Sequence, residues 1–373
     1  MSELWREVRD EFPVTRQCVY LHHAGVAPLC RPAAAAMHAL VDDVLNHGSN
    51  RYDRWLGAYH GLRKAAARLI NADPAEIAIV KNTSEGIATV ALGIDWRPGD
   101  RIVAFEEEFG ANYFPWKRLE ARGVHVEWLS VTDPPERIET AVRGARLLAI
   151  SFVQYLSGFR ADLEAIGAIC ERHGCLFFVD AIQGLGAFPL DVRRAKIGAL
   201  SADGHKWLLG PEGCGFLFVR HDLQDAIEPV EFGWTNVLHF ADYASRDMTL
   251  RPDAGRYECG TLNTVGCFGL RAAIEFLLGV GIERIAGSVA ALGDQLADGA
   301  RAKGYELLGT RTESTRAGIV TVRKPGTDSR MVVRALKDAG IVAAPRQDWV
   351  RLSPHFYISP EEIDRTVAVL ADA

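Results

Sequence analysis

The chain has 373 residues, a length that accommodates two domains or one large domain with a sizeable core. Hydrophobic residues make up 48% and charged residues 24%, and the formal net charge of −6 supplies no basic field for nucleic acid or anionic membranes. No apolar run approaches the roughly 18 residues that cross a bilayer. The charged start at residues 1–14 lacks the apolar core of a secretion signal, so a cytoplasmic protein is the default expectation.

The cysteine and histidine positions argue against a disulfide framework and a metal centre. The seven cysteines are scattered and no C-x-x-C pair occurs, which predicts reduced, mostly buried thiols. His22 and His23 are adjacent, and neighbouring residues of an extended segment point to opposite sides. We therefore expect no metal ion.

The first part of the chain predicts helices and then a strand with a possible anion site. Residues 1–20 are expected to form a short amphipathic helix and an extended lead-in, and two helices follow between residues 31 and 69. Residues 77–80 predict a short strand, with Thr83, Ser84 and Gly86 at the start of the next helix. Hydroxyl groups beside the free N–H groups of a helix N-terminus can bind an anion. The same residues also serve as an ordinary N-cap.

Two further buried strands precede side chains of chemical interest. Strand 101–105 is followed by Phe109, within the sequence EEEFGANYFPW, and strand 147–153 is followed by Gln154. Ligands of open α/β sheets bind beyond the carboxyl ends of the strands, where both side chains are placed. The alternative for Phe109 is a place in the core.

The stretch from residue 176 to residue 220 combines a buried carboxylate with a lysine. An apolar strand at 176–179 ends at Asp180, a second strand covers 216–219, and a glycine-rich turn between them carries Lys206 beside His205. A desolvated lysine can form a Schiff base with a carbonyl, and a carboxylate can hold a pyridine nitrogen protonated, as pyridoxal phosphate (PLP) requires. Taken alone, an Asp and a Lys are more often a turn residue and a solvated surface charge.

Together, the motifs resemble those of the class V aminotransferases. This branch of the fold-type I PLP enzymes also contains cysteine desulfurases, selenocysteine lyases, kynureninase and isopenicillin N epimerase. The segments that carry the resemblance are YLHHAGVAP, SFVQYLSGFRADL, VDAIQ, ADGHKWLLGPEGCGF, RYECGTLN and RLSPHFY. The resemblance implies an α/β, fold-type I PLP-dependent transferase. Its large domain (residues 21–255) would surround a mostly parallel seven-stranded sheet, beside a smaller α+β C-terminal domain (residues 256–373) on which residues 1–20 pack.

The resemblance also implies a role for each motif residue around the cofactor. Lys206 is expected to be the catalytic Schiff-base lysine, and Asp180 the catalytic partner of the pyridinium nitrogen. The remaining cofactor-binding residues are expected at the phosphate, on the ring face and at the ring 3-oxygen: Thr83, Ser84, His205, Phe109, Gln154 and Gln183.

On the substrate side, the resemblance places the backbone around His23 and Ala24 along the pocket and assigns the α-carboxylate to Arg351. Arg346 is a rival for that carboxylate in the same loop. Thr261 is expected to bind the PLP phosphate of a partner subunit. A homodimer with shared active sites is therefore implied, acting on a small-molecule amino-acid substrate, with neither nucleic acid nor membrane as a partner.

The predicted function is a PLP-dependent enzyme acting on an amino acid, first a class V aminotransferase, with a β-eliminating C–S lyase or an amino-acid epimerase as alternatives. Two departures disfavour a cysteine desulfurase. Asp203 stands where desulfurases carry a phosphate-binding serine, and we expect it to turn away into local backbone bonds. Residues 342–345 stand where desulfurases carry a persulfide-forming cysteine, and no cysteine follows Cys267. A PLP-binding protein without turnover is the other functional class, and no fused DNA-binding segment favours it.

Overall fold

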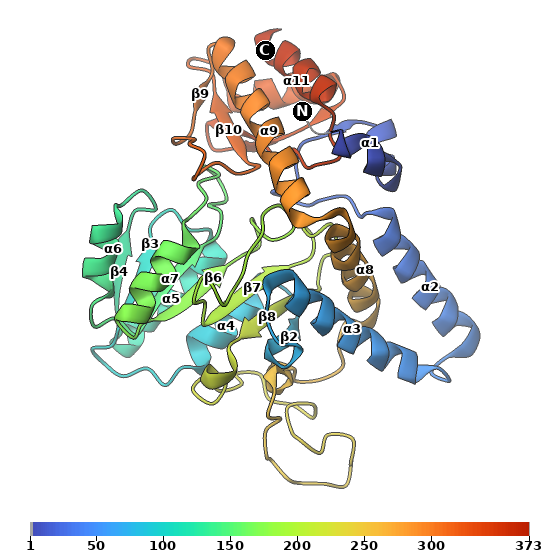
Figure 1. The fold of residues 1–373 in the computed structure, drawn as a ribbon, viewed down its shortest axis with the longest axis vertical. Helices are drawn as coiled ribbons and strands as arrows, with labels where there is room; N and C mark the ends of the chain where they lie inside the picture. Colours follow the sequence, from blue (N-terminus) through green and yellow to red (C-terminus); the bar gives the residue numbers. More distant parts are fainter. Residues whose placement is uncertain (1–2, 373) are drawn as a thin grey trace.

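The computed structural model describes residues 3–372 and is organised around one sheet of seven strands (Figure 1). The strand order is β2-β8-β7-β6-β5-β3-β4. Neighbouring pairs among β3 to β7 run parallel, whereas β8 is antiparallel to both β2 and β7. The strands are β2 (Ile77–Val80), β3 (Arg101–Phe105), β4 (His125–Leu129), β5 (Leu147–Ser151), β6 (Leu176–Asp180), β7 (Ala199–Asp203) and β8 (Gly215–Val219). The prediction of an α/β fold with a mostly parallel seven-stranded sheet is confirmed.

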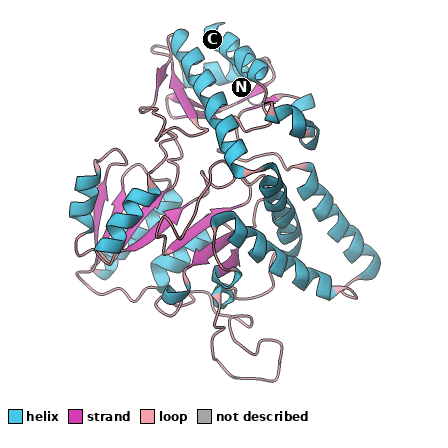
Figure 2. Cartoon of the chain, viewed as in Figure 1, coloured by secondary structure: helices cyan, strands magenta, loops and turns pink. Residues whose placement is uncertain are grey.

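Both faces of this sheet are buried because apolar residues continue without interruption along its central strands. In β5, Leu148 and Ile150 belong to one core cluster, and Leu147 and Ala149 belong to the other. Successive side chains of a strand point to opposite faces, so an unbroken apolar run supplies both clusters. Helices flank these strands (Figure 2), as is typical of parallel sheets.

The helices around the sheet are α2 (Arg31–His47), α3 (Tyr52–Ile70), α4 (Thr83–Gly93), α5 (Phe114–Arg118), α6 (Pro135–Val142), α7 (Leu163–Arg172) and α8 (Thr264–Val280). Helix α4 packs very closely on β7. A Cβ atom added to Gly86 of α4 would lie 2.2 Å from Ser201 Oγ, so this helix position requires glycine. The close approach holds the N-terminus of α4 against the edge of the sheet.

The C-terminal residues form a separate antiparallel sheet in the order β12-β13-β10-β9, at the top of Figure 1. Its strands are β9 (Glu306–Leu307), β10 (Val320–Arg323), β12 (Ala344–Arg346) and β13 (Trp349–Leu352). The helices of this part are α9 (Ile282–Ala302), α10 (Ser329–Asp338) and α11 (Pro360–Asp372).

The N-terminal segment packs on this C-terminal part. Strand β1 (Val19–Tyr20) pairs in parallel with β11 (Ile341–Val342), and helix α1 (Leu4–Val8) precedes it. The ring of Phe12 stacks on Tyr357 with centroids 3.8 Å apart, and Arg9 forms a 2.8 Å salt bridge with Glu362. The sequence predicts this packing for residues 1–20, and the domain boundary at residues 255–256 stays a prediction.

A long irregular segment joins β8 to α8 and extends away from the body at the bottom of Figure 1. Its side chains include exposed aromatic rings, with Phe232 53% and Tyr243 81% exposed. Within residues 3–372, no single helix is long and apolar enough to cross a membrane. Helices α8 and α9 meet that criterion only as a pair, and the pair is bent by 83°.

Candidate active site

A cavity of about 400 Å³ lies at the carboxyl edge of the large sheet, where β5, β6 and β7 end. The N-terminus of α4 reaches the same edge because β2, which precedes α4, runs in the same direction as β7. Segments from both chain ends complete the wall, around residues 22–26 and at Arg346 and Arg351. A cavity of this size is typical of small-molecule sites, which range over about 300–1,000 Å³.

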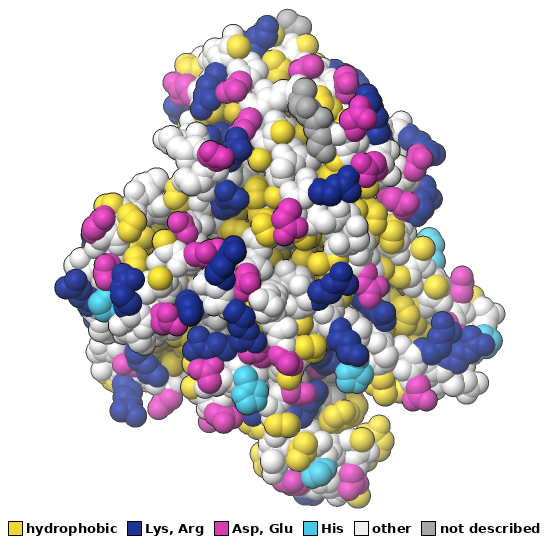
Figure 3. All heavy atoms as spheres, viewed as in Figure 1, with side chains coloured by type: hydrophobic (Ala, Val, Ile, Leu, Met, Phe, Trp, Pro, Cys, Tyr) yellow, Lys and Arg dark blue, Asp and Glu magenta, His cyan; other side chains and the backbone are white. Residues whose placement is uncertain are grey.

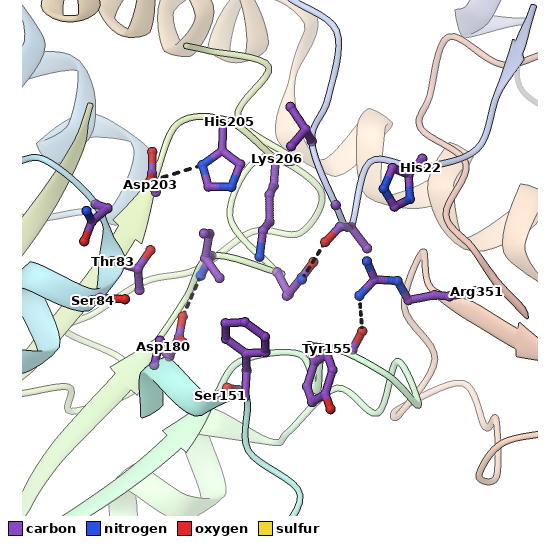
Figure 4. A pocket seen from close by; sticks show the side chains of 18 of the residues that line it. His22, Thr83, Ser84, Ser151, Tyr155, Asp180, Asp203, His205, Lys206 and Arg351 are labelled. Carbon is purple, nitrogen blue, oxygen red and sulfur yellow. Dashed lines mark hydrogen bonds and ion pairs between the residues drawn. The ribbon is translucent and has the colours of Figure 1, made fainter. Parts of the chain in front are cut away.

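Lys206 extends into the middle of this cavity from the turn between β7 and β8 (Figure 4). Backbone hydrogen bonds hold the turn, from Gly204 N–H to Cys214 O (2.9 Å) and from Leu209 N–H to Lys206 O (3.1 Å). Burial lowers the pKa of the Lys206 amine to about 8, although Asp180 acts in the opposite direction. Part of the amine is therefore neutral near pH 7 and can accept a proton.

Asp180 ends β6 and lines the cavity, with only 3% of its surface exposed. Its side chain accepts the Ile182 N–H at 3.1 Å and forms no salt bridge with any residue between 3 and 372. Burial raises the pKa of Asp180 to about 6, while the Ile182 N–H and Lys206 favour the charged form. A buried carboxylate without a cation is complementary to a positively charged ligand group.

A second carboxyl group, which the sequence did not indicate, lies close to Asp180. Glu108 accepts the Ser151 N–H at 2.6 Å and contacts the Ser151 hydroxyl, and Ser151 is the register partner of Asp180 in the neighbouring strand. Burial raises the pKa of Glu108 to about 8, and Asp180 adds to this shift. Glu108 is therefore mostly protonated at pH 7.

Two aromatic rings form one side of the cavity. Phe109 is 53% exposed and lines the cavity rather than the core, with its ring centroid 5.8 Å from Lys206 Nζ. Tyr155 packs against it with ring centroids 5.2 Å apart at 65°. Phe109 thus offers an apolar face to a flat ligand, and it carries no proton that it could transfer.

The hydroxyl group of Thr83 has no partner within the described residues, although it is buried. The N-cap of α4 is Asn82, whose side chain accepts the Glu85 N–H at 2.9 Å. Thr83 and Ser84 are therefore not needed as caps, and both line the cavity at the helix N-terminus. Free N–H groups and a positive helix end favour an anion at this place.

Asp203 faces the same end of the cavity, beside His205. The two side chains lie 3.1 Å apart, from His205 Nδ1 to Asp203 Oδ2, without the geometry of a hydrogen bond. Asp203 Oδ1 has no partner within residues 3–372, so the expected turn into local backbone bonds is wrong. Asp203 and His205 both line the cavity.

The two predicted glutamines differ in position. Gln183 lines the cavity, with its amide bound to Ala24 O (3.0 Å) and to the Trp207 indole N–H (2.9 Å). Gln154 lies outside the cavity wall, where its amide donates to Glu107 O at 2.6 Å and accepts the Leu156 N–H at 2.9 Å. The structure thus brings Gln183, and not Gln154, together with Lys206.

The N-terminal contribution to the cavity comes from His22 and not from His23. His23 is fully buried and its ring holds Ser353 O and the Tyr357 hydroxyl, each at 2.7 Å, so the side chain of His23 does not line the cavity. His22 and Ala24 line the cavity, which agrees with the expectation for Ala24. Burial, followed by the charges of Arg351, Arg346 and Lys206, lowers the pKa of His22 to about 4.

Arg346 and Arg351 both reach the cavity from the C-terminal sheet. Arg351 is 2% exposed and donates from Nη1 to Tyr155 O at 2.8 Å. Burial and the charge of Arg346 lower the pKa of Arg351 to about 10. Figure 4 shows Arg351 and His22 on one side of Lys206, and Thr83 on the other.

Thr261 lies outside this cavity. It is exposed and borders a separate hollow beside Trp234 and Tyr243 of the irregular segment. The structure of one chain therefore does not bring Thr261 together with Lys206, and its role toward a partner subunit stays a prediction.

The sequence model of the class V aminotransferases matches residues 19–345. The chain therefore belongs to the class V aminotransferase family, and the predicted resemblance is confirmed. A probable cysteine desulfurase of Methanothermobacter thermautotrophicus is 36% identical over 288 residues, which cover 75% of this chain and 71% of that protein.

Two solved structures share the fold over almost the whole chain. The apo structure of a cysteine desulfurase from Thermococcus onnurineus NA1 superposes with a TM-score of 0.91 at 26% identity, covering 98% of this chain and 97% of that one. The complex of the cystine C–S lyase C-DES with its reaction product cysteine persulfide gives a TM-score of 0.88 at 25% identity, covering 97% and 99%. The fold-type I prediction is confirmed.

The family is PLP-dependent, which confirms the cofactor prediction and makes the chain an enzyme, either an aminotransferase or a lyase of this fold. The cavity fits PLP on independent grounds. Thr83 has an unpartnered hydroxyl at a helix N-terminus for a phosphate, and Asp180 is a buried carboxylate for a protonated ring nitrogen. Lys206 supplies the amine and Phe109 the apolar face for the ring.

Proposed function

We propose that the protein is an aminotransferase that acts on an α-amino acid at Lys206. The observation that carries this proposal is the Lys206 amine in the cavity. The pKa of this amine is about 8, and the group that faces it is the phenyl ring of Phe109, which transfers no proton. No cysteine between residues 3 and 372 lines the cavity. Transamination needs one base that moves a proton between two carbon atoms, and this arrangement supports it.

The side chains divide the work between binding and proton transfer. When bound, PLP supplies a carbonyl that captures the substrate amine and a ring that accepts electrons from the α-carbon. Arg351 holds the substrate carboxylate and thereby orients the α-hydrogen, while Lys206 Nζ removes that proton and returns it. Asp180 keeps the ring nitrogen protonated, and Phe109 excludes water from one ring face.

The test supplies the PLP-loaded protein with a panel of amino acids, with and without α-keto acids, and measures keto-acid and amino-acid products. Transamination gives product beyond one equivalent only when an amino acceptor is present. Product formed in many turnovers without any acceptor would contradict the aminotransferase proposal.

The second candidate is a β-eliminating C–S lyase. The likeness to the cystine C–S lyase C-DES and to proteins named cysteine desulfurase supports it. A desulfurase that forms an enzyme persulfide is disfavoured because residues 342–345 contain no cysteine. Pyruvate and ammonia released from cystine or cysteine without an acceptor would favour the lyase.

We also propose that the active enzyme is a homodimer in which Thr261 completes the partner's site. The exposure of Thr261 and the exposed rings of residues 230–250 support this reading. Light scattering gives the mass in solution. Mixing inactive Lys206→Ala protein with Thr261→Asp protein should restore activity, since one site of the mixed dimer has both native residues. A monomer with full activity would contradict the proposal.

A further inference from the structure

Two arginines reach one end of the cavity without a carboxylate partner. Arg351 is 2% exposed, uses Nη1 for Tyr155 O, and has a buried Nε without a partner. Arg346 donates from Nη1 to the carbonyl oxygen of its own neighbour Pro345, at 2.9 Å. Neither guanidinium forms a salt bridge with a residue between 3 and 372. Arg346 is partly exposed, whereas Arg351 is buried, and buried guanidinium groups are normally paired, so this end of the cavity is complementary to anions.

The guanidinium groups of Arg346 and Arg351 line the same cavity and interact electrostatically. Arg346 contributes to the lowered pKa values of Arg351, His22 and Lys206, so its charge acts on each of them. The carboxylates that line the cavity, Asp180 and Asp203, lie away from Arg351 and His22, on the far side of Lys206 (Figure 4). The repulsion between the charges of Arg346 and Arg351 is relieved when a ligand brings negative charge.

The α-carboxylate of a substrate does not need the hydrogen-bond donors of both arginines. The open Nε and Nη2 of Arg351 form a planar pair of donors, which matches the two oxygens of an α-carboxylate. The donors of Arg346 that do not bind Pro345 O then remain for a second anionic group. His22 lines the same cavity with Nδ1 buried and unpartnered, and its ring occupies the space over Gly25. A Cβ atom at Gly25 would lie 2.1 Å from His22 Nε2, so glycine is required for this ring position.

We propose that the substrate is an amino acid whose side chain carries a second carboxylate, bound by Arg346 and His22. This inference rests on the proposed function, because it assumes that the α-carboxylate occupies Arg351. Arg346 supplies charge and paired donors, and His22 supplies an imidazole nitrogen. The spacing between the two anionic groups sets which side-chain length binds best.

The experiment uses acids that cannot react. Calorimetry on the PLP-loaded protein measures the affinities of malonate, succinate and glutarate, with acetate, propionate and butyrate as monocarboxylate controls. We expect at least one dicarboxylate to bind about tenfold more tightly than its monocarboxylate analogue, the effect of one charged hydrogen-bonded pair. Arg346→Gln should reduce that preference to below about threefold without weakening the monocarboxylate, whereas Arg351→Gln should weaken both acids.

Two further variants guard against loss of folding. Arg346→Lys keeps the charge without the planar donors and should give an intermediate preference, while Arg330→Gln, on an arginine with 83% side-chain exposure, should match the wild type. The thermal midpoint of each variant checks that it folds.

Three results would overturn the proposal: equal affinity for both acid classes, no dicarboxylate binding at millimolar concentrations, or an equal loss of both classes in Arg346→Gln. The probes carry no amine, so a failure of transamination leaves this binding measurement unaffected. The turnover panel in turn tests the reaction with neutral and acidic amino acids alike.

Discussion

The two ends of the cavity are built from different parts of the chain, and burial shifts the pKa values of an acid at one end and a base at the other in opposite directions. The cofactor end, which contains Thr83, Asp180 and Lys206, comes from the edge of one sheet. The substrate end, which contains His22, Arg346 and Arg351, comes from the N-terminal segment and the C-terminal sheet, joined by a bridge between His22 and Ser353.

Burial raises the pKa of the acid Asp180 to about 6 at the cofactor end and lowers the pKa of the base His22 to about 4 at the substrate end. His22 is therefore neutral near pH 7, so Arg346 and Arg351 make the substrate end complementary to an anion, while the buried Asp180 makes the cofactor end complementary to a cationic group. The face of the molecule drawn in Figure 3 mixes both signs of charge. Under the proposed function, the sheet edge supplies the general chemistry, and the two terminal segments supply selectivity for the substrate.

The largest effect is expected from Lys206→Ala, which removes the proposed proton-transfer group of the cofactor end. Turnover should fall by at least about a thousandfold, because both the base and the nucleophile are lost. Borohydride reduction and peptide mass analysis of the wild type should place PLP on Lys206. Lys117→Ala, on an exposed lysine paired with Glu120 at 2.8 Å, is the matched control. Unchanged turnover in Lys206→Ala would refute the assignment of the whole cavity.

A smaller loss is expected when Asp180→Asn alters only the charge at the cofactor end. Asparagine keeps the shape and the acceptor for the Ile182 N–H, but it no longer stabilises a protonated ring nitrogen. We expect kcat to fall by about a hundredfold, as for other groups that stabilise charge during the reaction, with little change in KM. Steady-state kinetics check this, with Asp298→Asn at an exposed ion pair as the control. An effect on KM alone would place Asp180 at the substrate end instead.

Gly25→Ala changes the substrate end and leaves the cofactor end intact. The added methyl group overlaps the His22 ring, which must move. KM for the preferred amino acid should rise by about tenfold, the effect of about 1.4 kcal/mol of binding, while kcat stays within about twofold. Gly57→Ala, where a Cβ meets no neighbouring atom, is the control. If kcat falls and KM does not, the two ends are not separable in the way described above.

The fold was predicted from the resemblance of several motifs to one family, and most of the cofactor end could be located from local patterns. Unbroken apolar runs indicate strands buried on two faces, and the chemistry lies where these strands end: Asp180, Lys206 and Thr83 follow that rule. Gln154 follows the same rule but is withdrawn from the cavity by its bonds to backbone atoms, which depend on the turn after β5.

The substrate end depends on contacts between residues far apart in the sequence. The alternation of an extended segment shows that only one of His22 and His23 can face the cavity. Which one does so is decided by Ser353 and Tyr357, which hold His23 in the core. No local pattern carries that information. Glu108 was also missed, since its burial follows from the packing of the loop after β3 against Ser151.

Glu108→Gln is expected to change stability and not catalysis, and it tests how strongly burial controls charge behind the cofactor end. The pKa of Glu108 rises from 4.5 to about 8 on burial, so the folded protein binds a proton that the unfolded chain releases between these values. Its contribution to stability is therefore largest at low pH and decreases as the pH rises from about 4.5 to 8. Glutamine copies the neutral carboxyl group, accepting the Ser151 N–H and donating to the Ser151 hydroxyl.

Urea unfolding of the PLP-loaded protein at pH 5 and pH 9 measures this difference. We expect Glu108→Gln to be within about 0.5 kcal/mol of the wild type at pH 5 and more stable by about 1–3 kcal/mol at pH 9. Glu120→Gln, at an exposed position, should show no such pH-dependent gain. A variant that is less stable at both pH values would mean that Glu108 is charged in the folded protein. Burial would then be too weak at this edge of the sheet to shift the pKa values of carboxyl groups, and the contrast between the two ends of the cavity would fail.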